Sequence, residues 1–175
     1  KVGVCNAFLL MREARKATGA QRQSLWLNAA AAFHGVDGYL QQRGTCFKEA
    51  AELEANSSKC AVLWRRAASC FERAGEMLKA AEALEQAREF DKAATFYERE
   101  HEWEEAARCL LSSSWAEREM QYKWLQCARA AATGDRRIPD WATEVVKKRK
   151  WWRIWAEVAA ACGDDGQQAK YLEEA

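Results

Sequence analysis

The chain has 175 residues, with 27 basic against 26 acidic side chains, so its net charge of +1 gives no general attraction to nucleic acid or to acidic lipid. No apolar run approaches the length of about eighteen residues that a membrane-spanning helix needs. We therefore expect no membrane insertion. No signal-peptide pattern opens the sequence, and we expect the chain to be a segment of a larger protein.

The first third of the chain predicts three helices. The earliest, around 8–16, has a loose apolar pattern, and clearer ones follow from Trp26 and from Phe47. In the two clearer helices a large apolar residue stands three positions before a pair of alanines, as in Trp26 before Ala29. This spacing places the apolar side chains on one face of an α-helix.

The same pattern becomes a strict repeat in the centre of the chain, where four Ala-Ala pairs recur at intervals of 13 residues. A large apolar residue stands three positions before each pair, and another stands four positions after its first alanine. Each unit therefore predicts one amphipathic helix of about eleven residues, with charged side chains on its wet face. The pairs begin at Ala67, Ala80, Ala93 and Ala106.

The gaps between these units are only two or three residues long, at 75–76, 88–89 and 101–102. A connection this short folds the next helix back antiparallel to the last, which gives one helical hairpin per 26 residues. Gly75 suits such a turn because it adopts positive φ without a Cβ penalty. The small alanines would let neighbouring helix backbones approach closely.

Beyond the central block the register slips near Trp115, which predicts either a longer turn or a bend in the superhelix over 111–117. Further helices are expected from Trp124, from Trp141, from Trp152 and over 167–174, which makes about eleven in all. No linker or low-complexity segment divides the chain. We therefore predict a single all-α domain over 1–175, an α-solenoid of short antiparallel helical hairpins.

Few residues could carry chemistry. The only histidines, His34 and His101, have no partner at a spacing that makes a metal or catalytic site, and no phosphate-binding loop or hydrolase motif is present. Paired carboxylates lie near helix starts, where the helix dipole favours acid. We expect no catalytic residues, no cofactor and no metal, and thus a protein that is not an enzyme.

The seven cysteines are odd in number and scattered, with no Cys-x-x-Cys spacing. Three of them, Cys70, Cys109 and Cys127, fall on apolar positions of the repeat. This usage is typical of reduced core cysteines in an intracellular protein, cytoplasmic or nuclear.

One local feature departs from the repeat, because residues 147–153 hold five cations and two tryptophans. The functional interpretation is a nucleic-acid contact, in which the cations bind phosphates and the bases stack on tryptophan. The alternative, which we favour, is that Trp152 belongs to the core and the lysines decorate a helix end, where cations are stabilised. The repeat does not explain Trp151, and Trp115 lies off its register, so both would be exposed contact candidates. The candidate partner or nucleic-acid contacts are Lys147, Lys148, Arg149, Lys150, Trp151, Arg153 and Trp115.

The run 67–110 resembles the tetratricopeptide-like helical arrays of SNAP-type adaptors, vesicle-coat and intraflagellar-transport subunits, and also the repeat arms of large helicase-related proteins. It departs from a tetratricopeptide repeat, which has a period of about 34 residues and a W-x2-L-G-x2-Y pattern. No peptide-clamp residue can therefore be carried over. The resemblance implies a protein-binding scaffold.

We accordingly predict a non-enzymatic scaffold for protein–protein interaction, whose partners are other proteins or other domains of the parent chain. The alternative is the helical arm of a nucleic-acid-processing protein that contacts RNA or DNA through 147–153. That alternative requires the cluster to be exposed and continuous with Arg136 and Arg137.

Overall fold

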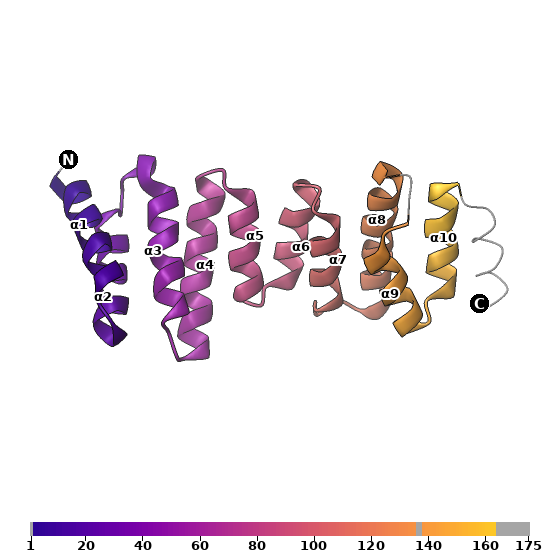
Figure 1. Ribbon diagram of the computed structural model, residues 1–175, viewed down its shortest axis with the longest axis horizontal. Coiled ribbons are helices and arrows are strands. Elements are labelled where there is room, and N and C mark those ends of the chain that lie inside the picture. The colour runs from indigo at the N-terminus through magenta and orange to yellow at the C-terminus, as the bar shows by residue number, and fades with distance from the viewer. Residues whose placement is uncertain (1, 136–137, 164–175) are drawn as a thin grey trace. The chain divides into compact units, whose positions relative to one another are not determined.

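The structure, a computed structural model, describes residues 2–135 and 138–163, and all its regular elements are helical (Figure 1). Within these ranges there is no strand, which confirms the predicted all-α class. The helix predicted over 167–174 lies outside the described residues. The described residues form ten α-helices: α1 (Val2–Lys16), α2 (Gly19–Ala32), α3 (Leu40–Glu52), α4 (Ser57–Arg73), α5 (Met77–Gln86), α6 (Phe90–Arg99), α7 (Trp103–Leu111), α8 (Glu117–Asp135), α9 (Asp140–Arg149) and α10 (Trp152–Cys162).

The helices belong to two compact units, Lys1–Phe96 and Tyr97–Ala175, and the boundary falls within α6. In the first unit each helix packs on the next, from α1 to α5. In the second unit α7 packs on α8, and α10 packs on both α8 and α9. Consecutive packing of short helices is the arrangement that the sequence repeat predicts. That the whole chain forms one continuous domain stays a prediction.

The Ala-Ala pairs lie at the helix contacts, and none of their eight side chains is more than 3% exposed. The large residues four positions after each first alanine are also buried. The residues three positions before the pairs differ, because Trp64 is buried while Met77, Phe90 and Trp103 are half-buried. Trp64 lies two turns inside α4, whereas the other three are the first residues of their helices and are covered by fewer neighbours.

The short turns between the central helices share one backbone conformation at an interval of 13 residues. The second residue after each helix adopts the left-handed conformation, with φ of 80° at Gly75, 61° at Arg88 and 62° at His101. The N–H of the next residue then donates to a carbonyl five residues earlier, as in Glu76 to Phe71 at 2.9 Å. These are the two marks of the Schellman helix ending.

The glutamate that completes each turn also begins the following helix. Its carbonyl accepts the N–H of the first alanine of the next pair, as in Ala80 to Glu76 at 3.0 Å. One residue therefore ends one helix and starts another, which explains how a three-residue connection suffices. The same pair of bonds recurs at Glu89, with Leu84 and Ala93, and at Glu102, with Tyr97 and Ala106.

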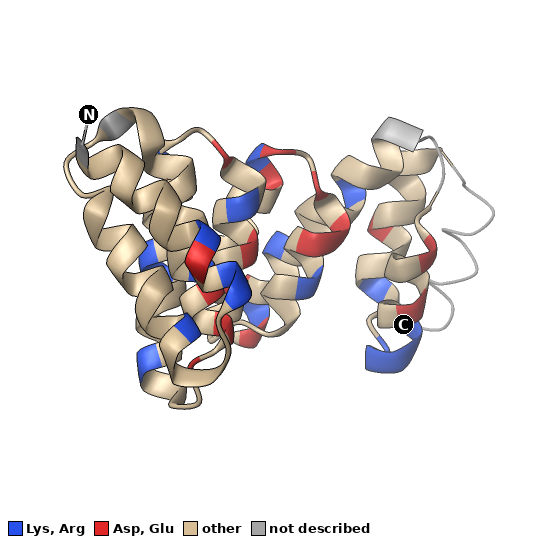
Figure 2. Cartoon of the chain, turned by 60° about the vertical axis from the view of Figure 1, so that its left-hand side comes forward, with Lys and Arg blue, Asp and Glu red and all other residues tan. Residues whose placement is uncertain are grey.

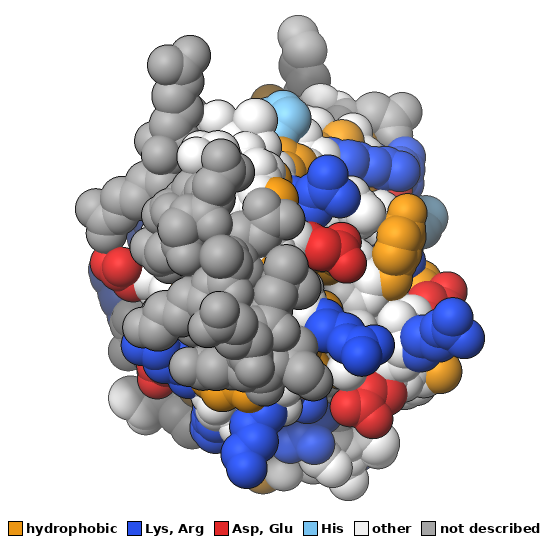
Figure 3. Space-filling view, turned by 90° about the vertical axis from the view of Figure 1, so that its right-hand side faces the viewer, with side chains coloured by type: hydrophobic (Ala, Val, Ile, Leu, Met, Phe, Trp, Pro, Cys, Tyr) orange, Lys and Arg blue, Asp and Glu red, His pale blue; other side chains and the backbone are white. Residues whose placement is uncertain are grey.

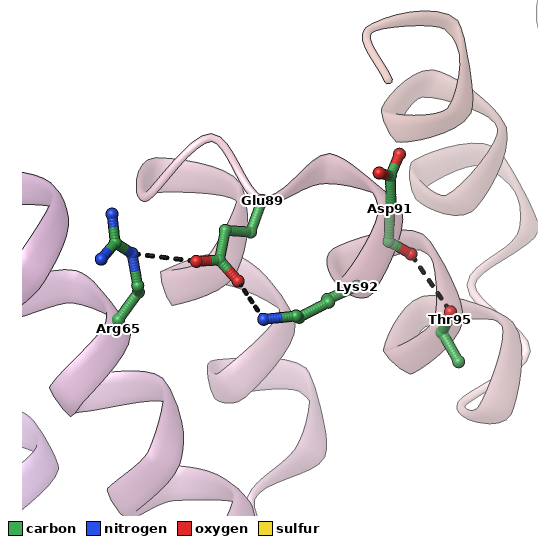
Figure 4. A network of polar contacts seen from close by, with 5 residues as sticks. All are labelled: Arg65, Glu89, Asp91, Lys92 and Thr95. Carbon is green, nitrogen blue, oxygen red and sulfur yellow. Dashed lines mark hydrogen bonds and ion pairs between the residues drawn. The ribbon is translucent and has the colours of Figure 1, made fainter. Parts of the chain in front are cut away.

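Glu89 also links helices that are not adjacent in sequence (Figure 4). Its carboxylate accepts from Nε of Arg65 in α4 at 2.9 Å and from Nζ of Lys92 in α6 at 2.6 Å. The Arg65 side chain is 51% exposed, so the pair contributes no more than about 1 kcal/mol. In the same view the Thr95 hydroxyl donates to the backbone carbonyl of Asp91 at 3.1 Å.

Candidate functional site

The predicted cationic cluster lies at the connection between α9 and α10. α9 ends at Arg149, Lys150 adopts the left-handed conformation with φ of 57°, and the Trp151 N–H donates to the Val146 carbonyl at 3.1 Å. This tight reversal brings the last turn of α9 and the first turn of α10 together. We call the five exposed cations Lys147, Lys148, Arg149, Lys150 and Arg153 the basic turn.

None of the basic-turn side chains forms an ion pair with a residue in the described part of the chain. The end of α9 is a continuous blue segment in Figure 2, and Figure 3 shows Lys and Arg side chains gathered at the lower edge of the face it draws. The lysines occupy the C-terminal turn of a helix, where the helix dipole stabilises cations. Their charge is therefore available to an anionic partner, and Arg136 and Arg137 lie outside the described residues.

Trp151 is not exposed, and this part of the prediction is wrong. Its side chain is only 9% exposed, and its ring meets the edge of Trp124 with centroids 5.6 Å apart. Trp124 is fully buried in α8 and also meets Trp141 edge-on at 5.7 Å. The left-handed Lys150 turns the chain so that residue 151 faces this tryptophan cluster. Trp151 therefore belongs to the core. The exposed cations beside it keep their charge, but the buried Trp151 ring offers no surface on which a base could stack.

Trp115 lies in the connection between α7 and α8, which confirms the predicted longer turn. It is half-buried, and Nζ of Lys123 lies 3.9 Å from its ring centroid. This cation–π contact covers one face of the indole with a side chain of the same unit. Trp115 is thus less open to a partner than its position off the repeat suggests.

A small pocket of about 240 Å³ adjoins the basic turn. Among the described residues, its lining consists of Gln121 of α8 and residues 150–154. The charged side chains among these are Lys150 and Arg153, both cationic, so the pocket suits an anionic group better than a neutral one.

A larger groove, of about 580 Å³, lies in the first unit and was not found from the sequence. Because α4 packs between α3 and α5, its side chains Trp64 and Phe71 form the floor together with Ala83 of α5. We call this feature the α3–α5 groove. Its walls are Thr45, Lys48, Glu49 and Glu52 of α3 and Lys79, Glu82, Glu85 and Gln86 of α5.

The walls of the α3–α5 groove hold four carboxylates and two ammonium groups. The lysines already have acidic neighbours, because Lys48 lies 4.0 Å from Glu52 and Lys79 lies 3.0 Å from Glu76. Among the wall acids, Glu49 pairs with Arg22 of α2 at 3.6 Å. The groove as a whole therefore has an acidic surplus.

The cysteines offer no activated thiol in the core. Burial raises the pKa of Cys46 to about 12, with Glu49 adding to the shift. Burial also raises the pKa of Cys127 to about 12, with Glu98 next in size, and raises the pKa of Cys70. A thiol with so high a pKa stays protonated and is a poor nucleophile. None of the seven cysteines, which all lie among the described residues, forms a disulfide, and the predicted core positions Cys70, Cys109 and Cys127 are buried.

Comparisons of the chain with protein families, with curated proteins and with solved structures found no match. Among the described residues, no group of three or more histidine, cysteine or acidic side chains is placed to hold a metal ion. None of the helices in 2–135 and 138–163 combines the length and apolar character required to cross a bilayer.

Proposed function

We propose that this chain is a non-enzymatic helical-repeat module that mediates protein–protein interaction within a larger intracellular protein. The observation that carries the proposal is the α3–α5 groove, a recess of about 580 Å³ formed by three consecutive helices. Stacked helical repeats commonly bind partners on the extended surfaces that their neighbouring helices form. The partner would be another protein or another domain of the parent chain.

Two features of the structure support a relation to tetratricopeptide-like arrays as part of this proposal. Helices α1 to α5 pack consecutively in the first unit, and the same turn geometry recurs at Gly75, Arg88 and His101. Regular turns hold successive helices in similar positions, which is what a repeated binding surface requires.

Blocking the groove tests the proposal. Thr45 lines the groove and is half-buried, so Thr45→Tyr places a phenol ring in the recess. Ser69→Tyr is the matched control, because Ser69 is exposed on α4 and does not line the groove. Proteins captured from lysates of cells that express the protein, with and without nuclease treatment, would be quantified by mass spectrometry for the wild type and both variants.

We expect a set of proteins that the wild type and Ser69→Tyr retain and that Thr45→Tyr loses. Circular dichroism and thermal melts of the three proteins should agree, which shows that the variants are folded. Retention of the same proteins by Thr45→Tyr, or their loss on nuclease treatment, would contradict the proposal.

A second candidate function is nucleic-acid contact through the basic turn. The specific observation in its favour is that five exposed cations lie on one turn with no acidic partner among the described residues. Because Trp151 is buried, binding would depend on phosphate charge more than on base stacking. Such binding is insensitive to sequence and falls steeply with salt.

The variant Lys147→Gln/Lys148→Gln/Lys150→Gln tests this candidate against a control that removes three exposed cations elsewhere, Arg12→Gln/Lys16→Gln/Lys59→Gln. Fluorescence anisotropy with single-stranded RNA would give affinity against salt. Loss of three phosphate contacts should reduce the slope of log K against log salt by about 2. Equal slopes for the two triple variants would exclude the basic turn as the contact.

A further inference from the structure

We propose that the α3–α5 groove binds a lysine- and arginine-rich segment of a partner protein. This inference depends on the proposed function and adds the chemistry of the partner.

The charge of the walls favours a cationic segment. Four carboxylates line the groove against two ammonium groups. Both carboxylates of α3 have a cationic neighbour, Lys48 or Arg22, whereas the lysine of α5 pairs with Glu76, which does not line the groove. An acidic segment would meet like charge from both α3 and α5, whereas a basic segment would find opposite charge on both walls. Glu52 and Glu82 are exposed, so the segment can reach them from solvent.

The floor favours side chains with an apolar stem and a charged end. Trp64 is 8% exposed, Phe71 2% and Ala83 1%, so the floor is apolar but presents little area to a large hydrophobic anchor. Lysine and arginine lay their methylene stems along apolar surface and keep the charged group in water or on a carboxylate. The groove therefore matches these side chains in both its floor and its walls.

The charge lies in the walls because of how the helices pack. Each helix turns its alanine pair and large apolar residues toward its neighbours, and its charged face remains outside. In the first unit α4 packs against α3 on one side and α5 on the other, which leaves the outer faces of α3 and α5 on either side of the recess. No single helix contains the site.

A selection from a random peptide display library against the wild-type protein tests the inference. We expect the enriched peptides to carry net positive charge and to lose binding when Thr45→Tyr blocks the groove. Their affinity, measured by fluorescence anisotropy with a synthetic copy of one enriched peptide, should fall as salt rises.

Matched charge variants then locate the contact. Glu52→Gln/Glu82→Gln removes one carboxylate from each wall, and Glu13→Gln/Glu72→Gln removes two exposed carboxylates that do not line the groove. We expect the wall variant to bind the selected peptide about threefold to thirtyfold more weakly than the wild type. The control variant should bind it as the wild type does.

The remaining outcomes overturn the inference in distinguishable ways. Enriched peptides that lack net positive charge but are blocked by Thr45→Tyr would leave the groove as a protein-binding site and reject a cationic partner. Cationic peptides that bind Glu52→Gln/Glu82→Gln as tightly as the wild type would also reject the inference. If no enriched peptide is sensitive to Thr45→Tyr, both the inference and the groove as the binding site fail.

Discussion

Gly44 of α3 lies against the ring of Phe71 in α4. A Cβ at this position would lie 2.8 Å from Cε1 and 2.9 Å from Cδ1 of the Phe71 ring. Phe71 is 2% exposed, so its ring is packed closely among neighbouring side chains. The absence of a side chain at residue 44 is therefore part of how these two helices pack.

We predict that Gly44→Ala destabilises the protein by about 1–3 kcal/mol, because overpacking exceeds the gain in helix propensity. Urea unfolding followed by circular dichroism measures the change. Gly3→Ala is the matched control, since the nearest atom to its Cβ would be the Ala32 carbonyl oxygen at 3.9 Å. The control should be neutral or slightly stabilising, and a stabilised Gly44→Ala would show that Phe71 can move.

The raised pKa of the buried Cys127 thiol predicts that the folded protein loses stability at high pH. Burial raises its pKa from 9.0 to about 12, so the folded state holds the proton over a range in which the unfolded thiol releases it. Because the unfolded state binds fewer protons there, the free energy of unfolding falls as pH rises from about 9 to about 12. The contribution of this thiol is fully present below about pH 9.

The midpoints of urea unfolding at about pH 7 and about pH 10.5 test whether the free energy of unfolding falls as pH rises. We expect Cys127→Ala to lose less stability than the wild type between these values, by up to about 2 kcal/mol. Cys5→Ala is the control, because Cys5 is exposed, and it should follow the wild type. If the free energy of unfolding depended on pH identically in all three proteins, the folded state would not hold the Cys127 proton, and the prediction would be wrong.

For individual residues, the sequence pattern predicts burial well at positions of the repeat and poorly at other positions. The eight alanines of the four pairs are buried as expected because helical spacing alone places them on the contact face. Trp151 was expected to be exposed because it follows no repeat position. Its burial depends on Trp124, 27 residues earlier in another helix, and local spacing holds no information about that contact.

The turn is the element that makes the repeat regular. Arg88 and His101 adopt at φ of 61° and 62° the conformation that Gly75 adopts at 80°. A left-handed conformation costs a residue with a side chain about 1–2 kcal/mol, whereas glycine adopts it freely. These two turns are therefore held by their neighbours against a local preference.

We predict that Arg88→Gly stabilises the protein by about 0.5–1 kcal/mol, the relief of the left-handed strain less the greater backbone entropy of glycine. Arg88 is exposed, so little packing is lost. Thermal melts would compare it with Arg129→Gly, which puts the same substitution inside α8 and should cost about 1 kcal/mol. Destabilisation by both substitutions would show that the Arg88 side chain, not its backbone, decides stability at this turn.

For the elements, the order of helices and the positions of the short turns could be predicted from the sequence because both depend on spacing within about thirteen residues. The α3–α5 groove could not. From the sequence, its wall residues are predicted to lie on the solvent-exposed faces of two separate helices. Only the packing of α4 between these helices makes the two faces the sides of one recess.

For the molecule as a whole, the near-zero net charge conceals a local separation of charge. The acidic surplus lies in the α3–α5 groove of the first unit, and the basic turn lies in the second. Binding that depends on one sign of charge should therefore depend on a few residues and not on the overall charge.

We expect Lys147→Gln/Lys148→Gln/Lys150→Gln to bind a groove-selected peptide with wild-type affinity, because the groove and the basic turn have no residue in common. Fluorescence anisotropy measures this, with Glu52→Gln/Glu82→Gln as the variant that should lose affinity. Weaker peptide binding by the lysine variant would show that the two surfaces act together.

The sequence by itself determined the all-α class, the helix order over the described residues, the antiparallel turns and the buried face of each central helix. These follow from backbone geometry and apolar spacing, which are properties of neighbouring residues along the chain. The tertiary structure alone decided that Trp151 joins Trp124 in the core and that α3 and α5 form the walls of a groove, because both depend on which helices come together. Burial and surface charge at such places are properties of pairs of distant segments, and a repeat pattern does not specify them.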